Sequence, residues 1–236
     1  MIHGPSLAIG AGIASVTIIM VFLAINGAAN ESELILNANP SDQELILSNT
    51  MQSILEANVV PILGDPKSPI TLVEFGDYQC HFCNVHFHNT EHSLLENYIS
   101  TGKVKMIFKD FTIIGPDSIN AAHGTHCAND QGKFWEYHDI LYNNWTGENN
   151  GWASSDNLLR FAQEIDLDID KWSDCMASAI HSQIITNSGK DARDLGLTGT
   201  PAFFVIGHDN KVTKIFGAQP FENFEKIFNL ELEKLS

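Results

Sequence analysis

Short apolar runs separated by turn-forming residues predict a β-α-β unit early in the folded part of the chain. Residues 59–63, 70–75 and 104–108 are apolar runs of strand length, and Gly-Asp-Pro at 64–66 separates the first two. Residues 80–100 contain no glycine or proline, which favours a helix between the second and third runs. A helix that connects two neighbouring strands implies that the strands pair in parallel.

The rest of the pattern predicts a long helical region followed by a β-β-α unit. Residues 119–195 are almost free of strand-like runs. The periodic segments in this region are 119–131, 133–145, 156–164 and 170–194. Strand-like runs at 202–206 and 212–216 predict a hairpin, and residues 221–235 predict a closing amphipathic helix. This order is typical of one α/β sheet domain with an all-helical insert over about residues 116–196.

The N-terminal segment, residues 1–29, contains no Asp, Glu, Lys or Arg, and residues 7–25 form a continuous apolar run. A helix of that length reaches about 28 Å, close to the hydrocarbon core of about 30 Å. We therefore expect an uncleaved transmembrane anchor; a signal cleaved near Ala29 and a buried core helix are the alternatives. Residues 30–56 then predict a tether with a short amphipathic helix over 42–56. Either membrane interpretation places the rest of the chain outside the cytoplasm.

Composition narrows the possible functions. Thirteen Lys and Arg residues against 29 Asp and Glu residues give a net charge of −16, which repels phosphate backbones. Nucleic-acid binding through a basic surface is thereby excluded. Four cysteines are too few for a disulfide-built miniprotein of this length, but they are enough for one redox or metal pair and one structural pair.

Cys80 and Cys83 form a Cys-x-x-Cys motif where a predicted strand gives way to a predicted helix. The amide groups and the positive dipole end of a helix N-terminus stabilise a thiolate, so we expect a lowered pKa for Cys80. Cys83 lies one turn later, near enough to form a disulfide with Cys80. The alternative is half of a zinc site, but Cys127 and Cys175 stand alone and provide no second Cys-x-x-Cys pair.

Two further features point to the same place. Glu74 lies six residues before Cys80 in an apolar strand, where a carboxylate is costly unless it is protonated or paired. An acid with a raised pKa beneath a dithiol could relay protons, whereas the alternative is a surface carboxylate at the end of the strand. Pro201 follows Thr200 and begins a buried-looking strand, and because proline lacks an N–H it leaves a backbone edge open to a substrate strand.

Three motifs together resemble the signatures of DsbA-like thiol oxidoreductases. They are EFGDYQC at residues 74–80, QGKFWEYHD at 131–139 and GTPAFF at 199–204. The resemblance covers residues 57–236 and implies a thioredoxin-like α/β fold with an inserted all-helical domain. In the middle motif, we expect Phe134 and Trp135 to pack the insert.

The resemblance also implies roles for individual residues. It makes Cys80 the attacking cysteine, Cys83 its partner and Glu74 the buried acid. It implies a cis peptide bond between Thr200 and Pro201 that faces the dithiol.

The dipeptide between the cysteines differs from the pattern of the best-known oxidases, which carry Cys-Pro-His-Cys. Here His81 comes first and Phe82 second. A protonated His81 would stabilise the Cys80 thiolate. We assign Thr200, His81 and Phe82 to substrate binding, and the change of dipeptide leaves the oxidising strength open.

A cluster of histidines allows a metal-binding interpretation. His81, His88 and His92 follow one another on the predicted helix, with Cys83 and His86 nearby, so a Cys/His copper or zinc chaperone is one alternative function. Histidines at a spacing of four are common by coincidence. We therefore expect no metal site.

Cys127 and Cys175 lie 48 positions apart in the predicted insert. Two free thiols beside an oxidising site would not persist reduced outside the cytoplasm, so we expect a structural disulfide rather than two separate buried cysteines. Such a disulfide contributes up to about 4 kcal/mol in the chain-entropy model.

These expectations combine into one function. We expect a membrane-tethered thiol:disulfide oxidoreductase outside the cytoplasm, acting as an oxidase that donates the Cys80–Cys83 disulfide to reduced or unfolded secreted or surface proteins. It needs no cofactor beyond that disulfide, and its expected reoxidising partner is a quinone-linked membrane protein. A disulfide isomerase or reductase is the alternative within the same class.

Overall fold

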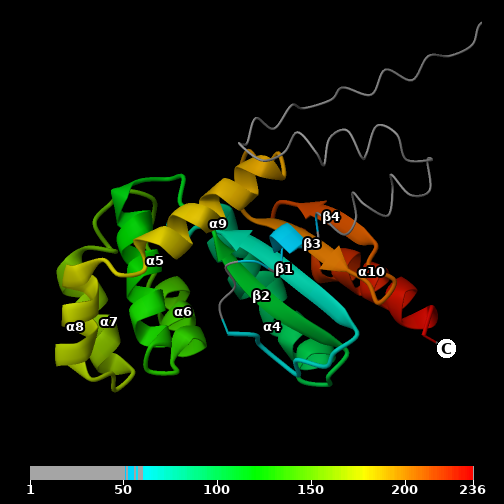
Figure 1. The fold of residues 1–236 in the computed structure, drawn as a ribbon, viewed down its shortest axis with the longest axis horizontal. Helices are drawn as coiled ribbons and strands as arrows, with labels where there is room; N and C mark the ends of the chain where they lie inside the picture. Colours follow the sequence, from blue (N-terminus) through cyan, green and yellow to red (C-terminus); the bar gives the residue numbers. More distant parts are fainter. Residues whose placement is uncertain (1–50, 52, 56, 58–60, 236) are drawn as a thin grey trace, which may run out of the picture. The chain divides into compact units, whose positions relative to one another are not determined.

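A four-stranded mixed sheet positions the cysteine motif (Figure 1). The computed structural model describes residues 51, 53–55, 57 and 61–235. The strands are β1 (Ile70–Gly76), β2 (Val104–Asp110), β3 (Ala202–Ile206) and β4 (Val212–Phe216), in the order β2-β1-β3-β4. Strand β1 pairs in parallel with β2 and antiparallel with β3, which pairs antiparallel with β4. The predicted parallel pair and the predicted hairpin are both confirmed.

The predicted helix after β1 is confirmed as a continuous helical stretch over residues 81–99. It consists of α3 (His81–His86), the π-helical segment η1 (Phe87–Glu91), α4 (His92–Leu94) and the π-helical segment η2 (Leu95–Ile99). The wider π-helical turns were not predicted.

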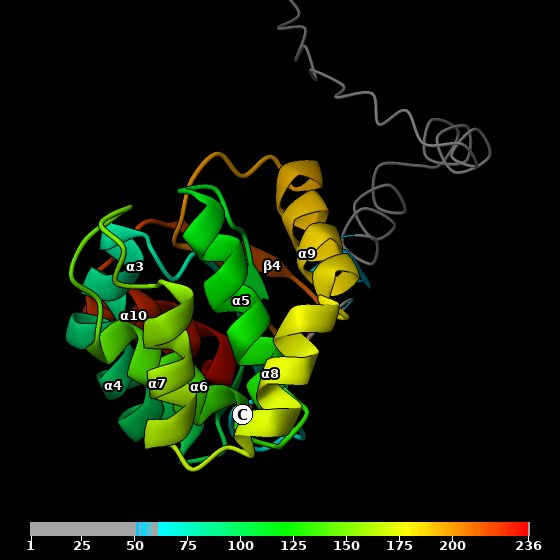
Figure 2. The ribbon, with the colours of Figure 1, turned by 90° about the vertical axis from the view of Figure 1, so that its left-hand side faces the viewer.

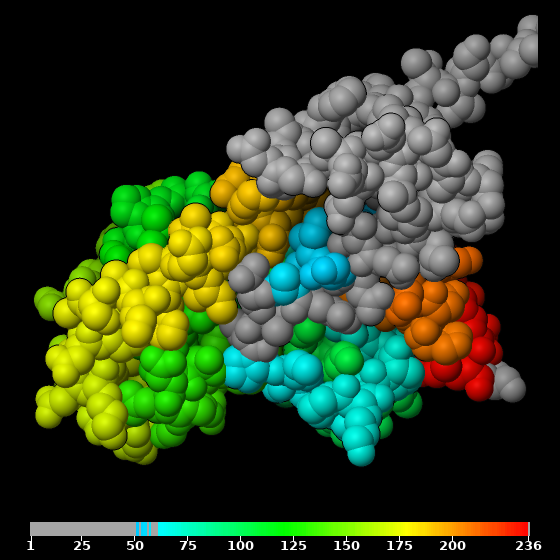
Figure 3. Space-filling view, viewed as in Figure 1, coloured from blue at the N-terminus to red at the C-terminus, as the bar shows by residue number. Residues whose placement is uncertain are grey.

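Five helices form the insert between β2 and β3 (Figure 2). They are α5 (Pro116–Asn129), α6 (Phe134–Asn143), α7 (Ser155–Glu164), α8 (Ile169–Ser178) and α9 (Ser182–Asp194). The single predicted segment over 170–194 is therefore wrong, because Ala179 adopts a left-handed conformation with φ of 49° and ends α8. In the space-filling view, the yellow residues of α8 and α9 lie against the green residues of the insert's first helices (Figure 3).

Alternate residues of the strands face opposite sides of the sheet, as the period of two requires. Leu72 and Phe203 belong to a core with Phe224 and Phe228 of the closing helix α10 (Phe221–Glu233). The next residues along the two strands, Val73 and Phe204, belong to a separate core. That second core includes Ala192 of α9, so helical segments cover both faces of the sheet.

The described residues include only part of the N-terminal region for which an anchor, a tether and a strand are predicted. Residues 7–25 and most of the predicted tether lie outside the described residues. No helix among the described residues is long and apolar enough to cross a membrane. In the described part of the strand predicted at 59–63, only a single bridge forms, between Leu63 and Met106. The pairing does not extend further because Pro61 lacks an amide hydrogen and Gly64, with φ of 95°, turns the chain.

Candidate active site

The two cysteines lie at the junction between β1 and α3. Cys80 is the N-cap residue of α3, with φ of −66° and ψ of 126°, and Cys83 lies one turn into the helix. Both are free thiols in this structure, with 5% of Cys80 and 1% of Cys83 exposed. A nearly inaccessible Cys83 leaves Cys80 as the sulfur that a substrate can approach first.

Asp77 holds the turn that carries Cys80. Its Oδ1 accepts a hydrogen bond from the Gln79 amide at 2.8 Å, and its backbone carbonyl accepts one from the Cys80 amide at 2.9 Å. Its Oδ2 accepts two more, from the Ile113 and Ile114 amides at 2.7 and 2.9 Å. The buried carboxyl of Asp77 therefore ties the cysteine turn to the segment that follows β2.

A loop of the insert docks on the same turn. Glu148 Oε1 accepts a hydrogen bond from the His81 amide at 2.9 Å, so a carboxylate from the insert satisfies the first free amide of α3. The Trp145 indole donates to the Gln79 carbonyl at 2.8 Å, and the Asn149 amide donates to Gln79 Oε1 at 2.9 Å. Local sequence patterns do not predict these contacts, because they join residues 66 to 70 positions apart.

The two thiols differ in acidity. The pKa of Cys80 is lowered to about 6, chiefly because the Cys83 thiol donates a hydrogen bond to it. Burial opposes this change, and Thr200 lowers the pKa further. Burial raises the pKa of Cys83 well above its ordinary value. At neutral pH, Cys80 is therefore mostly a thiolate and Cys83 a thiol, and the thiolate is the nucleophilic form.

The segment before β3 faces Cys80 as expected. In its thiol form, Cys80 donates from Sγ to the Thr200 carbonyl at 3.3 Å, and the Thr200–Pro201 peptide bond is cis. Phe82 is 59% exposed and His81 is exposed as well, so both lie on the accessible side of the motif. The structure thus brings the predicted substrate-binding residues around one thiol.

Glu74 lies beneath the dithiol in the central strand. It is 1% exposed, which rules out the alternative of a surface carboxylate. Burial, and then the charge of Cys80, raise the pKa of Glu74 to about 8. Its Oε2 has no hydrogen-bond partner among the described residues and lies 4.0 Å from Nε2 of His86.

The histidines of the metal-binding interpretation do not converge in the structure. The His81 ring packs on Trp145 at 5.5 Å, and His88 Nε2 lies 3.4 Å from the Tyr142 carbonyl oxygen. Among the described residues, the groups with metal-ligand spacing are Cys127–Cys175–His181, Glu74–His86–Glu91 and Glu91–His138–Asp139.

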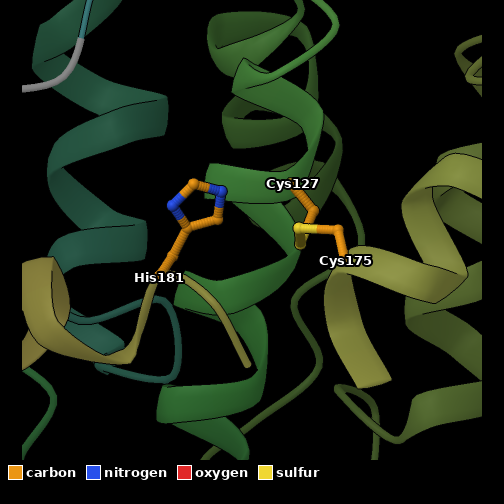
Figure 4. Close-up of side chains that lie close together, drawn as sticks. All are labelled: Cys127, Cys175 and His181. Atoms are coloured by element: carbon orange, nitrogen blue, oxygen red, sulfur yellow. A yellow bond between two sulfur atoms is a disulfide. The ribbon is translucent and has the colours of Figure 1, made fainter. Parts of the chain in front are cut away.

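The remaining cysteines lie in the insert. A disulfide joins Cys127 of α5 to Cys175 of α8, with the Cα atoms 5.8 Å apart (Figure 4). The His181 ring lies on one side of this disulfide, and its Nε2 is 2.8 Å from Asp130 Oδ2. These sulfurs are bonded to each other, so they provide neither a free thiol nor a metal-ligating thiolate in this state.

Comparisons with known proteins include a family model, a curated relative and two solved structures. The family model described as Thioredoxin matches residues 56–228. The chain is 28% identical over 176 residues to a probable disulfide bond formation protein D of Bacillus cereus, covering 73% of this chain and 78% of that relative. It is similar to the crystal structure of alpha-DsbA1 of Wolbachia pipientis, with a TM-score of 0.68, 26% identity, and coverage of 79% of this chain and 99% of that one. It also shares the fold of oxidised BdbD of Bacillus subtilis, with a TM-score of 0.66, 22% identity, and coverage of 74% of this chain and 93% of that one.

Proposed function

Since the chain belongs to the thioredoxin family and is a DsbA-like thiol-disulfide oxidoreductase, we propose that it acts as an oxidase outside the cytoplasm. In this proposal, it donates a disulfide formed between Cys80 and Cys83 to secreted or surface proteins that still carry reduced cysteines. The redox-active disulfide is the whole of its redox chemistry, with no added cofactor.

The acidity of Cys80 is the observation that carries the proposal. A pKa lowered from 9.0 to about 6 stabilises the thiolate of the reduced enzyme. Each pKa unit corresponds to about 1.4 kcal/mol between the two protonation states, and this stabilisation drives the enzyme's disulfide toward reduction. A disulfide that is easily reduced is a strong oxidant of other thiols.

The reaction follows from the positions of the two sulfurs. A substrate thiolate attacks Cys80 Sγ, the Cys80–Cys83 bond breaks, and Cys83 leaves as a thiolate that takes up a proton. A second substrate thiolate then attacks the substrate sulfur of the mixed disulfide, and Cys80 leaves as a stabilised thiolate. Two electrons pass from the substrate to the enzyme, and the substrate gains a disulfide.

The surface around Cys80 supports a protein substrate. The exposed Phe82 ring offers an apolar contact, and Thr200 brings a backbone edge next to the reacting sulfur. In this proposal, Pro201 and Thr200 align an extended substrate segment while His81 and Phe82 contact its side chains.

Membrane attachment and recycling rest on the N-terminal sequence. We propose that residues 7–25 anchor the protein, with cleavage near Ala29 as the alternative, and that a quinone-linked membrane protein restores the Cys80–Cys83 disulfide. The net charge of −16 supports a protein that does not act on nucleic acid.

Equilibration of the full-length protein with glutathione at a series of potentials tests the direction of the reaction. We expect a Cys80–Cys83 potential nearer to about −120 mV than to about −180 mV, the values of a strong oxidase and of an isomerase. A value near about −180 mV indicates the isomerase, and a value near about −270 mV indicates a reductase.

A further inference from the structure

Glu91 is a second buried carboxyl close to Glu74, and it belongs to none of the three sequence motifs. It ends the π-helical segment η1 and is 7% exposed. Burial, and then the charges of Glu74 and Asp139, raise its pKa well above the ordinary value. Burial thus shifts the pKa of Glu91 in the same direction as that of Glu74.

Glu74, His86 and Glu91 form a compact polar cluster in an otherwise apolar region. One carboxylate oxygen from each glutamate and one ring nitrogen of His86 lie within 4.8 Å of one another. Neither ring nitrogen of His86 has a hydrogen-bond partner among the described residues, and burial lowers the pKa of this histidine to about 3. His86 supplies no positive charge at neutral pH, so burial and the mutual repulsion of the two carboxylates favour their protonated forms.

The π-helical turn explains why these groups meet. Along an α-helix, a residue and the fifth residue after it lie about 140° apart around the axis, because each residue turns the chain by about 100°. In a π-helix, the hydrogen bonds run from residue i to i+5, which stacks such residues nearly above each other. The segment Phe87–Glu91 is π-helical, so Glu91 falls on the side of His86 that faces Glu74.

A surface cavity reaches Glu91 from the outside. The cavity has a volume of about 370 Å³ and is lined by Phe87, His88, Glu91, His92, Leu95, Asp139 and Asn143. Glu91 therefore belongs both to the lining of this water-accessible space and to the buried cluster, whereas Glu74 does not line the cavity.

We propose that Glu91 is a relay residue that passes protons between this cavity and Glu74, which exchanges them with Cys83. The inference rests on the proposed function, and it adds the route by which the buried thiol gains its proton. Glu91 acts through Glu74 and does not touch the sulfurs. Its position at the end of a π-helical turn fits the frequent occurrence of such turns at functional sites.

In this relay, each group that gives up a proton takes one from the next group toward the solvent. When substrate thiolate attacks Cys80, Cys83 leaves as a thiolate and takes the proton of the Glu74 carboxyl. The Glu74 carboxylate takes a proton from the Glu91 carboxyl, and the Glu91 carboxylate takes one from water in the cavity. The net change is one proton moved from solvent to Cys83 for each Cys80–Cys83 bond broken.

Several groups facing Glu91 set the pH range of the relay. On α6, His138 and Asp139 lie next to it, and burial raises the pKa of Asp139 to about 6, with the charge of Glu136 adding to the shift. Burial lowers the pKa of His138 to about 3, so its ring is neutral at physiological pH. His88 and His92 line the cavity from the same helical stretch as Glu91.

The test compares three variants of the full-length protein. The variants are Glu91→Gln, Glu91→Asp and, as a matched control, Glu96→Gln, which changes an exposed glutamate of the same helical stretch. The measurements are the rate at which dithiothreitol reduces the Cys80–Cys83 disulfide at pH 7, its solvent deuterium isotope effect, and the equilibrium with glutathione. We expect Glu91→Gln to slow reduction by about tenfold with a larger isotope effect, and to leave the glutathione equilibrium within about twofold.

The other variants separate a relay from a structural role. Glu91→Asp keeps an acid and should retain most of the rate, and Glu96→Gln should match the wild type. Three results would overturn the proposal. Glu91→Gln and Glu91→Asp could slow reduction equally, or Glu91→Gln could keep the wild-type rate. The third is a divalent cation that the wild type holds and Glu91→Gln loses. Failure of the wild type itself to exchange with dithiothreitol and glutathione would instead refute the proposed function.

A measurement on the wild type keeps the proposal testable if Glu91→Gln does not fold. The infrared difference spectrum between the oxidised and reduced wild type should contain bands of two protonated carboxyls that respond to the redox state. A response from a single carboxyl, assigned to Glu74 by Glu74→Gln, contradicts a relay through Glu91.

Discussion

At the scale of single residues, the site depends on an unequal environment for two chemically identical thiols. Cys80 accepts a hydrogen bond from the Cys83 thiol, whereas Cys83 is enclosed and loses its hydration. The same burial that keeps Cys83 protonated also prevents a substrate from reaching it. Acidity and access therefore favour the same sulfur as the point of attack.

Separate cysteine variants should show this division of roles. We expect Cys83→Ser to accumulate substrate proteins as mixed disulfides on Cys80, because the sulfur that would release them is absent. Cys80→Ser should abolish exchange. Non-reducing gels followed by mass spectrometry of the trapped proteins measure both outcomes, and exchange by Cys80→Ser would show that the roles are assigned wrongly.

The lowered pKa of Cys80 predicts a pH dependence for the reduced protein. Alkylation of Cys80 by iodoacetamide should increase with pH around a midpoint of about 6, the pKa of this thiol. Since the pKa falls from 9.0 on folding, the thiolate's contribution to the stability of the reduced protein is complete above pH 9 and is lost as the pH falls through about 6. Urea unfolding of the reduced protein across this range checks the sign, and stability that rises toward low pH through this group contradicts it.

Glu148 should oppose the acidity of Cys80. Its carboxylate accepts the first amide of α3, beside the place where the thiolate charge forms. Glu148→Gln keeps a hydrogen-bond acceptor and removes the charge, so it should lower the alkylation midpoint and make the disulfide more oxidising. The energy expected of an exposed charge near a helix end is about 0.3–1 kcal/mol, or a fraction of a pH unit. Glu96→Gln serves as the control, and an unchanged midpoint in Glu148→Gln excludes this influence.

At the scale of elements, local pattern predicts most of the fold and only part of the site. Short continuous apolar runs sufficed for β1, β2 and β3, because these strands are buried on both faces, and periodic apolar residues sufficed for most of the helices. The Cys-x-x-Cys position at a helix start followed from the same order of elements. Spacing did not reveal the end of α8 at Ala179, because neither glycine nor proline marks it.

The missed features of the site depend on tertiary contacts. The π-helical turns of residues 87–91 place Glu91 beside His86, but the local sequence carries no signal that distinguishes them from α-helical turns. The Glu148 contact joins segments 67 positions apart, and the Asp77 contacts join β1 to the segment after β2. Such contacts follow from the packing of whole elements, and a single sequence does not specify them.

Lys109 joins three elements and should be important for stability. Its Nζ donates to the Ile54 and Ala57 carbonyls at 2.9 and 2.6 Å and to Asp191 Oδ2 at 2.8 Å. Lys109→Met would remove these donors and the charge facing Asp191, so we expect a loss of about 3–5 kcal/mol in the free energy of unfolding. Lys105→Met, on the same strand but more accessible, is the control in urea unfolding. Equal effects of the two substitutions contradict a special role for Lys109.

At the scale of the whole molecule, the disulfide of the insert should stabilise without taking part in exchange. It closes a loop of 48 residues between α5 and α8. Replacing both Cys127 and Cys175 by alanine should cost up to about 4 kcal/mol in the chain-entropy model. Oxidation of a reduced peptide by the folded variant should continue at the wild-type rate. A large loss of rate at a temperature where the variant is folded would show that this disulfide contributes to the chemistry.

The order of the cysteines has a consequence for how the polypeptide matures. A nascent chain that crosses a membrane N-terminus first presents Cys80, Cys83, Cys127 and Cys175 in that order. The first two cysteines to emerge form the Cys80/Cys83 pair, and the last two form the Cys127–Cys175 disulfide. In a chain exported in this order, pairing each cysteine with its neighbour in this way gives the Cys127–Cys175 bond and leaves Cys80 and Cys83 to each other.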